Sequence, residues 1–318
     1  MNLSLQDINH LHYITKMTRK HNTDNISRTK AYLNYYFAHP EIKWSFLASM
    51  VSRNAGYNMT DLWLPPFINM LNEKERTRMF ITYERANWLI FSDAYPQLLT
   101  YELSSFLNKP MFYLLKNFHV SQFMINEWES FWNTNNVNRL VRALIVNEQN
   151  VIQAPVIKQS FFRKHVFTSL PYLLQDFLMM NAAVFPTFSG VLYGIYVHDF
   201  SNVSKRIRIG KQLATILFTP SIYHQVINFA KKCEHTGSRM DYEQFINVNL
   251  PVAPLLRSVY PVIEHQDIIR RDWFNWVGIK KKWLEEENVE VKEIGKSFYR
   301  KRAMLYAYYH LKQTVKHQ

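Results

Sequence analysis

The stretch FINMLNEKERTRMFITYERANWLIFSDAYPQLLTYELSSFL, residues 67–107, carries a long helical pattern of apolar side chains. At about 100° per residue, one side of this helix collects Phe80, Tyr83, Glu84, Asn87, Phe91, Ala94 and Leu98. Glu84 and Asn87 therefore lie in an otherwise apolar stripe, where an unpaired carboxylate is costly to bury. They indicate either a functional site or a structural ion pair in the core. Pro96 lacks a backbone N–H, so we expect it to kink or end the helix.

Similar helical patterns lie on both sides of this stretch, at residues 24–39, 41–56, 120–133, 135–153, 219–233 and 291–312. Ser121 and Thr219 are suitable N-cap residues, and Pro220 takes the favoured first helical position. The chain has 7 glycines in 318 residues and no sustained alternation typical of strands. We therefore predict an all-α fold, a single large irregular multi-helix domain with a basic C-terminal helical appendage.

The segment MVSRNAGYNMTDLWLPP, residues 50–66, is polar between two apolar segments. Gly56 is typical of the position after a helix C-terminus, and Asn58 or Thr60 can cap a following helix. We therefore expect a helix-to-helix corner that ends one helix at Gly56.

A corner of this kind does not explain why the polar residues Arg53 and Asn54 stand at these positions. Arg53 follows the apolar residues WSFLASM, so its charge is expected to be buried. A buried arginine needs a partner, and Glu84 is a natural carboxylate for it.

Four polar residues interrupt another apolar helix: Asn147, Glu148, Gln149 and Asn150. Such a run covers most of the circumference of a helix, so at least one of these side chains faces the core. The pattern is equally consistent with a site and with a helix that ends in solvent before Pro155.

A third cluster, CEHTGSRMDYEQF, covers residues 233–245. Gly237 can close one helix, and Ser238 with Asp241 resembles a capping box for the next. That structural explanation leaves His235 and Arg239 unexplained. A histidine beside an arginine suits an anionic ligand or acid–base chemistry.

The chain is basic, with a net charge of +13, and residues 270–318 hold 12 Lys/Arg against 6 Asp/Glu. This excess indicates either a solvated surface or a polyanionic partner such as nucleic acid or anionic lipid. We place a boundary near Gly278 and predict a helical core domain of residues 1–278. Residues 279–318 are then a basic helical tail that packs on it.

The single cysteine, Cys233, excludes an internal disulfide and fits a cytoplasmic location. The N-terminus also lacks the pattern of a secretory signal. Residues 177–197, FLMMNAAVFPTFSGVLYGIYV, are uncharged and long enough to span a bilayer. Pro186 and Gly190 divide this stretch, so two buried core segments are favoured over a membrane span.

The familiar phosphate-loop, nucleophile-elbow and dinucleotide motifs are absent from the sequence, and one cysteine gives no Cys/His zinc spacing. We therefore predict no metal site, and the sequence leaves any cofactor unknown.

Four segments carry a family resemblance: SRNAGYNMTDL, ERANWLIFSDAYPQLL, NEQNVIQ and HTGSRMDY. Together, across residues 50–242, they resemble the YppC-like proteins of Bacillus and relatives. This family is assigned to a domain of unknown function. The resemblance therefore implies a bacterial cytoplasmic protein and supplies no catalytic residues.

The polar clusters lead to the hypothesis of an internal site for a small anionic ligand. The predicted ligand-binding residues are Arg53, Asn54, Asn87, Glu148 and Arg239, and the predicted catalytic residues are Glu84 and His235. This hypothesis requires that Arg53, Glu84 and His235 converge. The alternative is a non-enzymatic adaptor that binds nucleic acid or a protein partner through the basic C-terminal region. Association with a membrane through residues 177–197 is a third, less favoured hypothesis.

Overall fold

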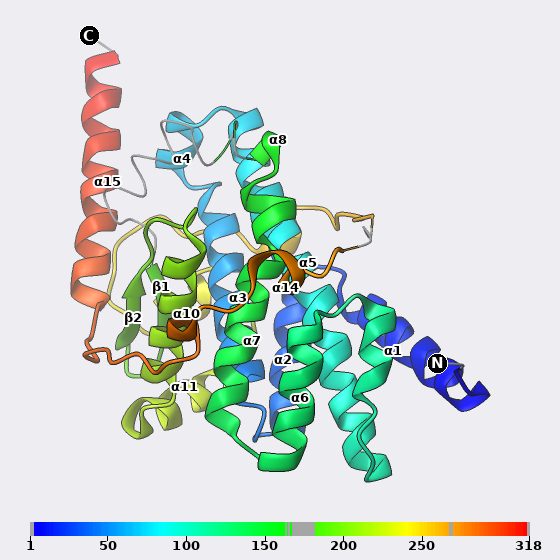
Figure 1. Cartoon of the computed structure of the whole chain (residues 1–318). Helices are drawn as coiled ribbons and strands as arrows, with labels where there is room; N and C mark the ends of the chain where they lie inside the picture. The colour runs from blue at the N-terminus through cyan, green and yellow to red at the C-terminus, as the bar shows by residue number, and fades with distance from the viewer. Residues whose placement is uncertain (1–2, 163, 165, 167–181, 267–269, 317–318) are drawn as a thin grey trace.

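The computed structural model describes residues 3–162, 164, 166, 182–266 and 270–316, and most of these residues are helical (Figure 1). The longer helices are α1 (Leu5–His21), α2 (Asn25–Ala38), α3 (Lys43–Asp61), α5 (Glu73–Leu107), α6 (Gln122–Thr134), α7 (Val137–Val151), α10 (Val203–Leu217), α11 (Pro220–Lys232) and α15 (Gly295–Lys316). Shorter helical segments are α4 (Pro65–Met70), η1 (Phe112–Phe118), η2 (Gln153–Ile157), α8 (Ser160–Phe162), α12 (Met240–Glu243), α13 (Leu256–Val259), α14 (Phe274–Val277) and η4 (Lys281–Trp283). The predicted mostly helical fold is confirmed.

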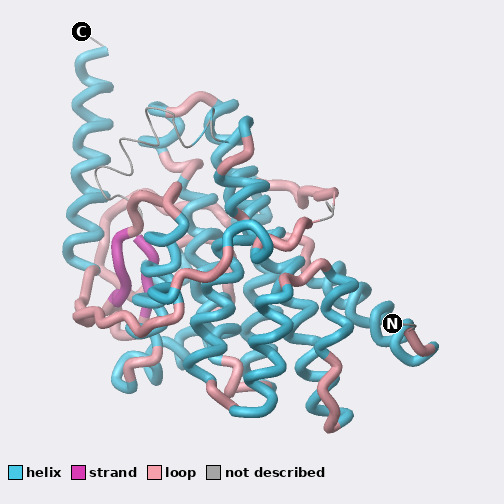
Figure 2. Tube along the Cα trace, viewed as in Figure 1, coloured by secondary structure: helices cyan, strands magenta, loops and turns pink. Residues whose placement is uncertain are grey.

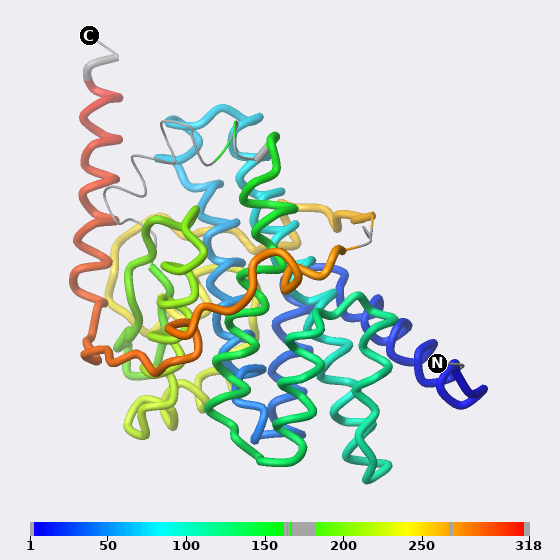
Figure 3. The backbone as a smooth tube through the Cα atoms, viewed as in Figure 1, coloured from blue at the N-terminus to red at the C-terminus, as the bar shows by residue number. Residues whose placement is uncertain are grey.

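Helix α3 lies at the centre of the molecule and contacts α2, α5, α7, α10 and β1 (Ala182–Pro186). In Figure 3 it passes beside segments that are far away in the sequence, including the green α7. Its apolar residues, such as Trp44, Phe46 and Met50, belong to the main core. A helix surrounded in this way buries most of its circumference, and Val51 is its one exposed residue.

One of the two predicted N-caps makes its hydrogen bond. Ser121 accepts a hydrogen bond from the backbone N–H of Met124 at the start of α6. Thr219 precedes α11, which begins with Pro220, although the hydroxyl of Thr219 bonds to the carbonyl of Thr215 instead.

Helix α5 continues through Pro96 to Leu107, so Pro96 does not end it. A proline in a helix interior costs about 3 kcal/mol. The residues around Pro96 offset this cost because Phe91, Leu98 and Leu99 pack in the main core. The hydroxyl of Thr100 also donates to the carbonyl of Pro96 at 2.8 Å.

The expected helix end at Gly56 is wrong, because α3 runs on to Asp61. A Cβ atom at Gly56 would collide with Asn25 Oδ1 and lie 2.9 Å from His235 Nε2. Gly56 therefore allows α3 to pack closely against Asn25 of α2 and against His235. Thr60 lies inside α3 as well, and its hydroxyl donates to the carbonyl of Gly237. Neither Asn58 nor Thr60 caps the next helix, since α4 follows Leu64.

Residues 182–196 form an antiparallel hairpin, magenta in Figure 2, of β1 and β2 (Leu192–Tyr196). Ala182 pairs with Tyr196, and Pro186 pairs with Leu192. Gly190 lies in the turn with a φ of 78°, which favours glycine. The hairpin corresponds to the second part of the uncharged stretch, whose residues 177–181 lie outside the described residues. Within the described ranges, no helix combines the length and apolar character needed to cross a bilayer.

The residues after Gly278 pack on the body of the protein. Trp283 is buried in the main core, and Phe298 packs with Tyr57 and Tyr242 in a second apolar cluster. Arg302 of α15 donates to Asp61 of α3 at 3.0 Å. The basic C-terminal helix is therefore held by both apolar and ionic contacts.

Candidate functional site

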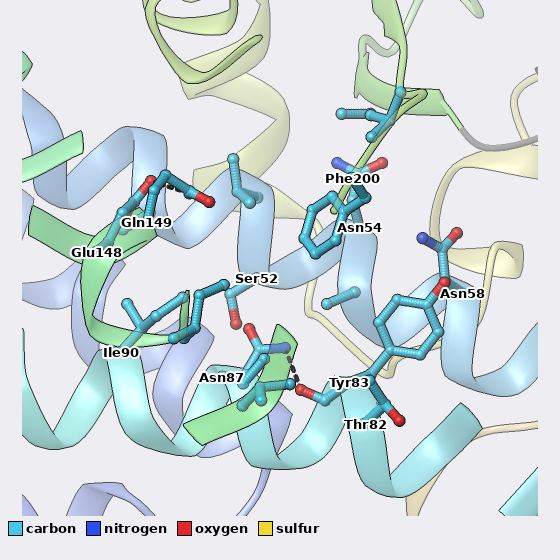
Figure 4. A pocket seen from close by; sticks show the side chains of 18 of the residues that line it. Ser52, Asn54, Asn58, Thr82, Tyr83, Asn87, Ile90, Glu148, Gln149 and Phe200 are labelled. Carbon is cyan, nitrogen blue, oxygen red and sulfur yellow. Dashed lines mark hydrogen bonds between the residues drawn. The ribbon is translucent and has the colours of Figure 1, made fainter. Parts of the chain in front are cut away.

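A cavity of about 200 Å³ lies between α3, α5, α7, β1 and the residues that follow β2 (Figure 4). Most of its wall is apolar, and it includes Val51, Ala55, Ala86, Ile90 and Phe200. The volume far exceeds the space that one water molecule needs. The cavity has the features of a small-molecule pocket, which are an apolar wall and a few polar groups.

Glu148 and Gln149 form one polar end of this cavity. The indole N–H of Trp44 donates to Glu148 Oε2 at 3.1 Å, and Gln149 Nε2 donates to Glu148 Oε1 at 3.0 Å. Burial raises the pKa of Glu148 to about 7, despite these bonds and the charge of Arg206. Among the described residues, no Lys or Arg lies within ion-pair distance of Glu148. Its carboxyl group therefore holds an exchangeable proton near neutral pH.

Asn58, Tyr83 and Asn87 line another part of the wall, where Tyr83 lies beside Asn58 in Figure 4. Burial raises the pKa of Tyr83 to about 12, so its hydroxyl keeps its proton at neutral pH. The Asn87 amide donates to the carbonyl of Tyr83, and Asn58 Oδ1 accepts from Arg239. The Tyr83 hydroxyl and the carbonyl oxygen of Asn87 are thus suitable groups for a ligand.

Asn54 is also part of the wall, but its amide is used within the protein. It donates to the carbonyl of Val184 at 2.8 Å and accepts from the N–H of Val184 at 2.8 Å. This pair of hydrogen bonds to the backbone of Val184 holds β1 against α3. Asn54 therefore shapes the cavity by holding the hairpin in place.

Glu84 lies outside the cavity wall and pairs with Arg28 of α2. Arg28 Nη2 lies 2.5 Å from Glu84 Oε2, and His265 Nε2 lies 3.5 Å from Glu84 Oε1. Burial opposes ionisation, but the charge of Arg28 and the hydrogen bonds hold the pKa of Glu84 below its usual value. The expected pairing of Glu84 with Arg53 is wrong, because Arg28, which the sequence reasoning missed, takes that place. Arg28 itself lines the cavity.

Arg53 instead faces the segment after α11. Its Nη2 donates to the carbonyl of Cys233 at 2.7 Å, and its Nη1 lies 3.9 Å from Asp241 Oδ2. The same carboxylate lies 3.2 Å from His235 Nδ1 and accepts from Thr236. The predicted capping box is therefore absent, since Asp241 bonds to His235 and Thr236. Gly237 also lies beyond the end of α11 at Lys232 and does not close that helix.

His235 is enclosed between Asp241 and Asn25, with its Nε2 2.9 Å from Asn25 Oδ1. Burial lowers the pKa of His235 to about 4, Asp241 opposes this shift, and Arg53 adds to it. The imidazole is therefore neutral at physiological pH. It links α2 to the 235–241 segment, outside the cavity wall.

Arg239 is held by three partners in a separate cluster. It donates to Asp61 at 2.7 Å, to the hydroxyl of Tyr242 at 2.8 Å and to Asn58 at 2.9 Å. All of its nitrogen atoms are used, so the charge of Arg239 stabilises the junction of α3 and α12. It lies behind Asn58 rather than on the cavity wall.

The structure therefore divides the predicted site residues. Asn54, Asn87 and Glu148 line the cavity, whereas Arg53, Glu84, His235 and Arg239 lie outside its wall. Sequence reasoning missed Arg28, Asn58 and Tyr83, which do line it. In the described part of the chain, no group of three or more His, Cys, Asp or Glu residues is arranged to hold a metal ion.

Comparison with known proteins agrees with the resemblance seen in the sequence. A family model described as a protein of unknown function, DUF2515, matches residues 20–297. The chain belongs to this family. It is 46% identical over 305 residues to the uncharacterized protein YppC of Bacillus subtilis (strain 168), and the match covers 95% of each chain. No solved structure matches it.

Proposed function

We propose that this DUF2515-family protein binds a small, mainly apolar molecule with a polar head group in the central cavity. The observation that carries the proposal is the position of Glu148, a carboxyl group with a pKa of about 7 at one end of an apolar cavity. A carboxyl group without a cationic partner in such a place is typical of functional sites.

Three of the arginines at or near the cavity already face carboxylates. Arg28 is neutralised by Glu84, as Arg239 is by Asp61, and Arg53 faces Asp241. A strongly anionic ligand would therefore gain little from these cations. A weak acid or a neutral acceptor can instead take a hydrogen bond from protonated Glu148.

If the protein also transforms its ligand, we expect Glu148 to transfer the proton rather than Glu84 or His235. Glu84 is fixed as an anion by Arg28, and His235 is neutral and enclosed. Glu148 has a pKa near the working pH, which is the favourable condition for general acid–base catalysis.

Titration with the neutral fluorescent probe 1-aminoanthracene tests the proposal, with octanol and octanoic acid as competitors. Ala55→Leu and Ala86→Leu add bulk at half-buried positions on the wall and should weaken probe binding at least about tenfold. The matched control is Ala38→Leu, which adds the same bulk at the exposed end of α2. Equal binding by all three variants would contradict a ligand site in this cavity.

The pH dependence distinguishes the head groups. If Glu148 donates to an uncharged acceptor, displacement by octanol weakens above about pH 7, and Glu148→Gln removes this dependence. If octanoic acid competes well only at low pH, the cavity takes the neutral acid. Tighter competition by octanoate at high pH would instead favour an anionic ligand.

The second candidate function is the non-enzymatic adaptor that binds nucleic acid or protein through the basic C-terminal region. It is favoured by α15, whose sequence from Gly295 to Lys316 contains no Asp or Glu. Deletion of residues after Gly278 is unsuitable as a test, because it would remove Trp283 and Phe298 from the core. Charge-neutralising substitutions on α15, with labelled RNA as the probe, test this candidate in a folded protein. A cytoplasmic location remains part of both proposals.

A further inference from the structure

Helix α15 has an inner face that anchors it to the body. Phe298, Arg302 and Tyr306, each four residues apart, are buried. Arg302 pairs with Asp61 of α3, and Gln313 donates to Asn69 of α4 at 2.7 Å. The inner face is therefore fixed at both the first and the last part of the helix.

The outer face of α15 carries an exposed apolar line. Met304 is 66% exposed, Tyr308 is 55% exposed and Leu311 is 68% exposed. These positions follow the spacing i, i+4 and i+7, so they lie on one side of the helix. Since the inner face is already anchored, rotation of the helix to bury this line would break the Arg302–Asp61 pair.

Toward the N-terminus of the helix, the same side carries positively charged residues. Lys296 and Arg300 precede Met304 at steps of four residues, and both are exposed. Lys312 follows Leu311 and is exposed as well. The helix contains six Lys/Arg and no Asp/Glu, so no acidic side chain of its own neutralises them.

We propose that this outer face docks on the surface of an anionic lipid bilayer. Met304, Tyr308 and Leu311 would enter the boundary between head groups and acyl chains, and Lys296, Arg300 and Lys312 would lie against acidic head groups. A helix face that combines basic and apolar residues binds the membrane surface in this way without crossing the bilayer. In Figure 1, α15 stands at one edge of the molecule, and its C-terminal part extends past the hairpin, which suits contact with a flat surface.

Two other occupants fit the surface less well. A second copy of the chain would place two acid-free, positively charged helices side by side, and like charges repel. Nucleic acid would satisfy the basic residues, but its phosphates give no reason for the exposed aliphatic side chains Met304 and Leu311. An anionic bilayer satisfies both kinds of residue.

Vesicle co-sedimentation of the full chain tests this proposal. The wild-type protein should bind vesicles of phosphatidylcholine with phosphatidylglycerol and should not bind vesicles of phosphatidylcholine alone. Each Lys or Arg near an anionic surface strengthens binding by about fivefold, so Lys296→Gln with Arg300→Gln should weaken it by about 25-fold. Met304→Ser with Leu311→Ser should weaken it by at least about tenfold, because apolar burial is lost.

The control variants remove positive charge or an apolar side chain elsewhere on the surface. Lys231→Gln with Lys232→Gln removes two exposed charges from α11, and Phe106→Ser removes an apolar side chain that is 85% exposed. Both controls should bind the anionic vesicles like the wild type. Because all of these positions are exposed, each variant should keep the thermal unfolding curve of the wild type.

Three results would overturn the proposal. The first is a lack of wild-type binding to the anionic vesicles, and the second is unchanged binding by both α15 variants. The third is competition by single-stranded RNA that depends on Lys296 and Arg300 but not on Met304 and Leu311, which would identify a nucleic-acid surface. Vesicle binding is independent of the cavity, so Ala55→Leu should not affect it.

Discussion

Two glutamates of the interior, the buried Glu84 on α5 and the partly buried Glu148 on α7, show how a partner decides the role of a charged group. Burial disfavours the charged form of both. Arg28 offsets this effect at Glu84, whose pKa is lowered. At Glu148 the hydrogen-bond donors among the described residues are neutral, and its pKa is about 7 although the charge of Arg206 acts to lower it. The ion pair of Glu84 joins α5 to α2, whereas Glu148 presents a protonatable carboxyl group to the cavity.

The largest expected effect comes from breaking the first pair. Glu84→Gln leaves the charge of buried Arg28 without its carboxylate, which should lower the free energy of unfolding by about 3–5 kcal/mol. Glu148→Gln, the matched substitution at the other glutamate, should cost far less at neutral pH. Urea unfolding of both variants measures the contrast, and equal losses would contradict it.

A second test concerns the packing that joins α2, α3 and the 235–241 segment. Gly56→Ala places a methyl group against Asn25 and His235 and should lower the free energy of unfolding by about 1–3 kcal/mol. This loss would occur although alanine favours a helix more than glycine does. Gly295→Ala is the control, because its Cβ would meet Leu192 only at ordinary contact distance, 3.7 Å. Stabilisation by both substitutions would show that Gly56 is not tightly packed.

The third test uses pH. Unfolded glutamate has a pKa of about 4.3, so between about pH 4.5 and 7 the folded protein keeps a proton on Glu148 that the unfolded chain releases. The wild type therefore loses stability as pH rises through this window, and the loss is complete above the folded pKa. Relative to the wild type, Glu148→Gln should gain about 1–2 kcal/mol across it, a range reduced because the carboxyl faces the cavity. A constant difference between the two proteins would show that the pKa of Glu148 is not raised.

The smallest effect is expected for an ion pair in water. Glu290 and Lys292 lie 2.8 Å apart, but both side chains are more than half exposed. Glu290→Gln should leave the urea midpoint unchanged, because solvent and salt screen exposed pairs. A loss as large as that of Glu84→Gln would mean that pairing matters regardless of burial.

Local signals in the sequence predicted most of the longer helices, but α1 and α10 were not among them. The N-cap at Ser121 and the proline start of α11 depend on neighbouring residues alone. The hairpin gave no strand signal because every residue of β1 is buried, so apolar and polar side chains do not alternate. Gly56 was misleading for a similar reason, since its role depends on Asn25 and His235 rather than on the local backbone.

The candidate site was only partly predictable. Periodicity correctly places Glu84 inside the core, and Glu148 belongs to a polar run that has to face inward in part. Periodicity cannot predict which arginine pairs with Glu84, however, because the partner, Arg28, lies 56 positions away in the sequence. The cavity itself depends on how α3, α5, α7 and β1 are spaced, which no single segment encodes.

The close contact between α2 and α3 has a consequence for the order of folding. These helices are adjacent in the chain and share more contacts than any other pair of elements in the described residues, so bringing them together costs little loop entropy. The bond from Asn54 to Val184 instead bridges 130 residues. An α2–α3 pair is thus expected to form early, and the hairpin closes the cavity late. The cavity would then be among the last parts of the protein to form.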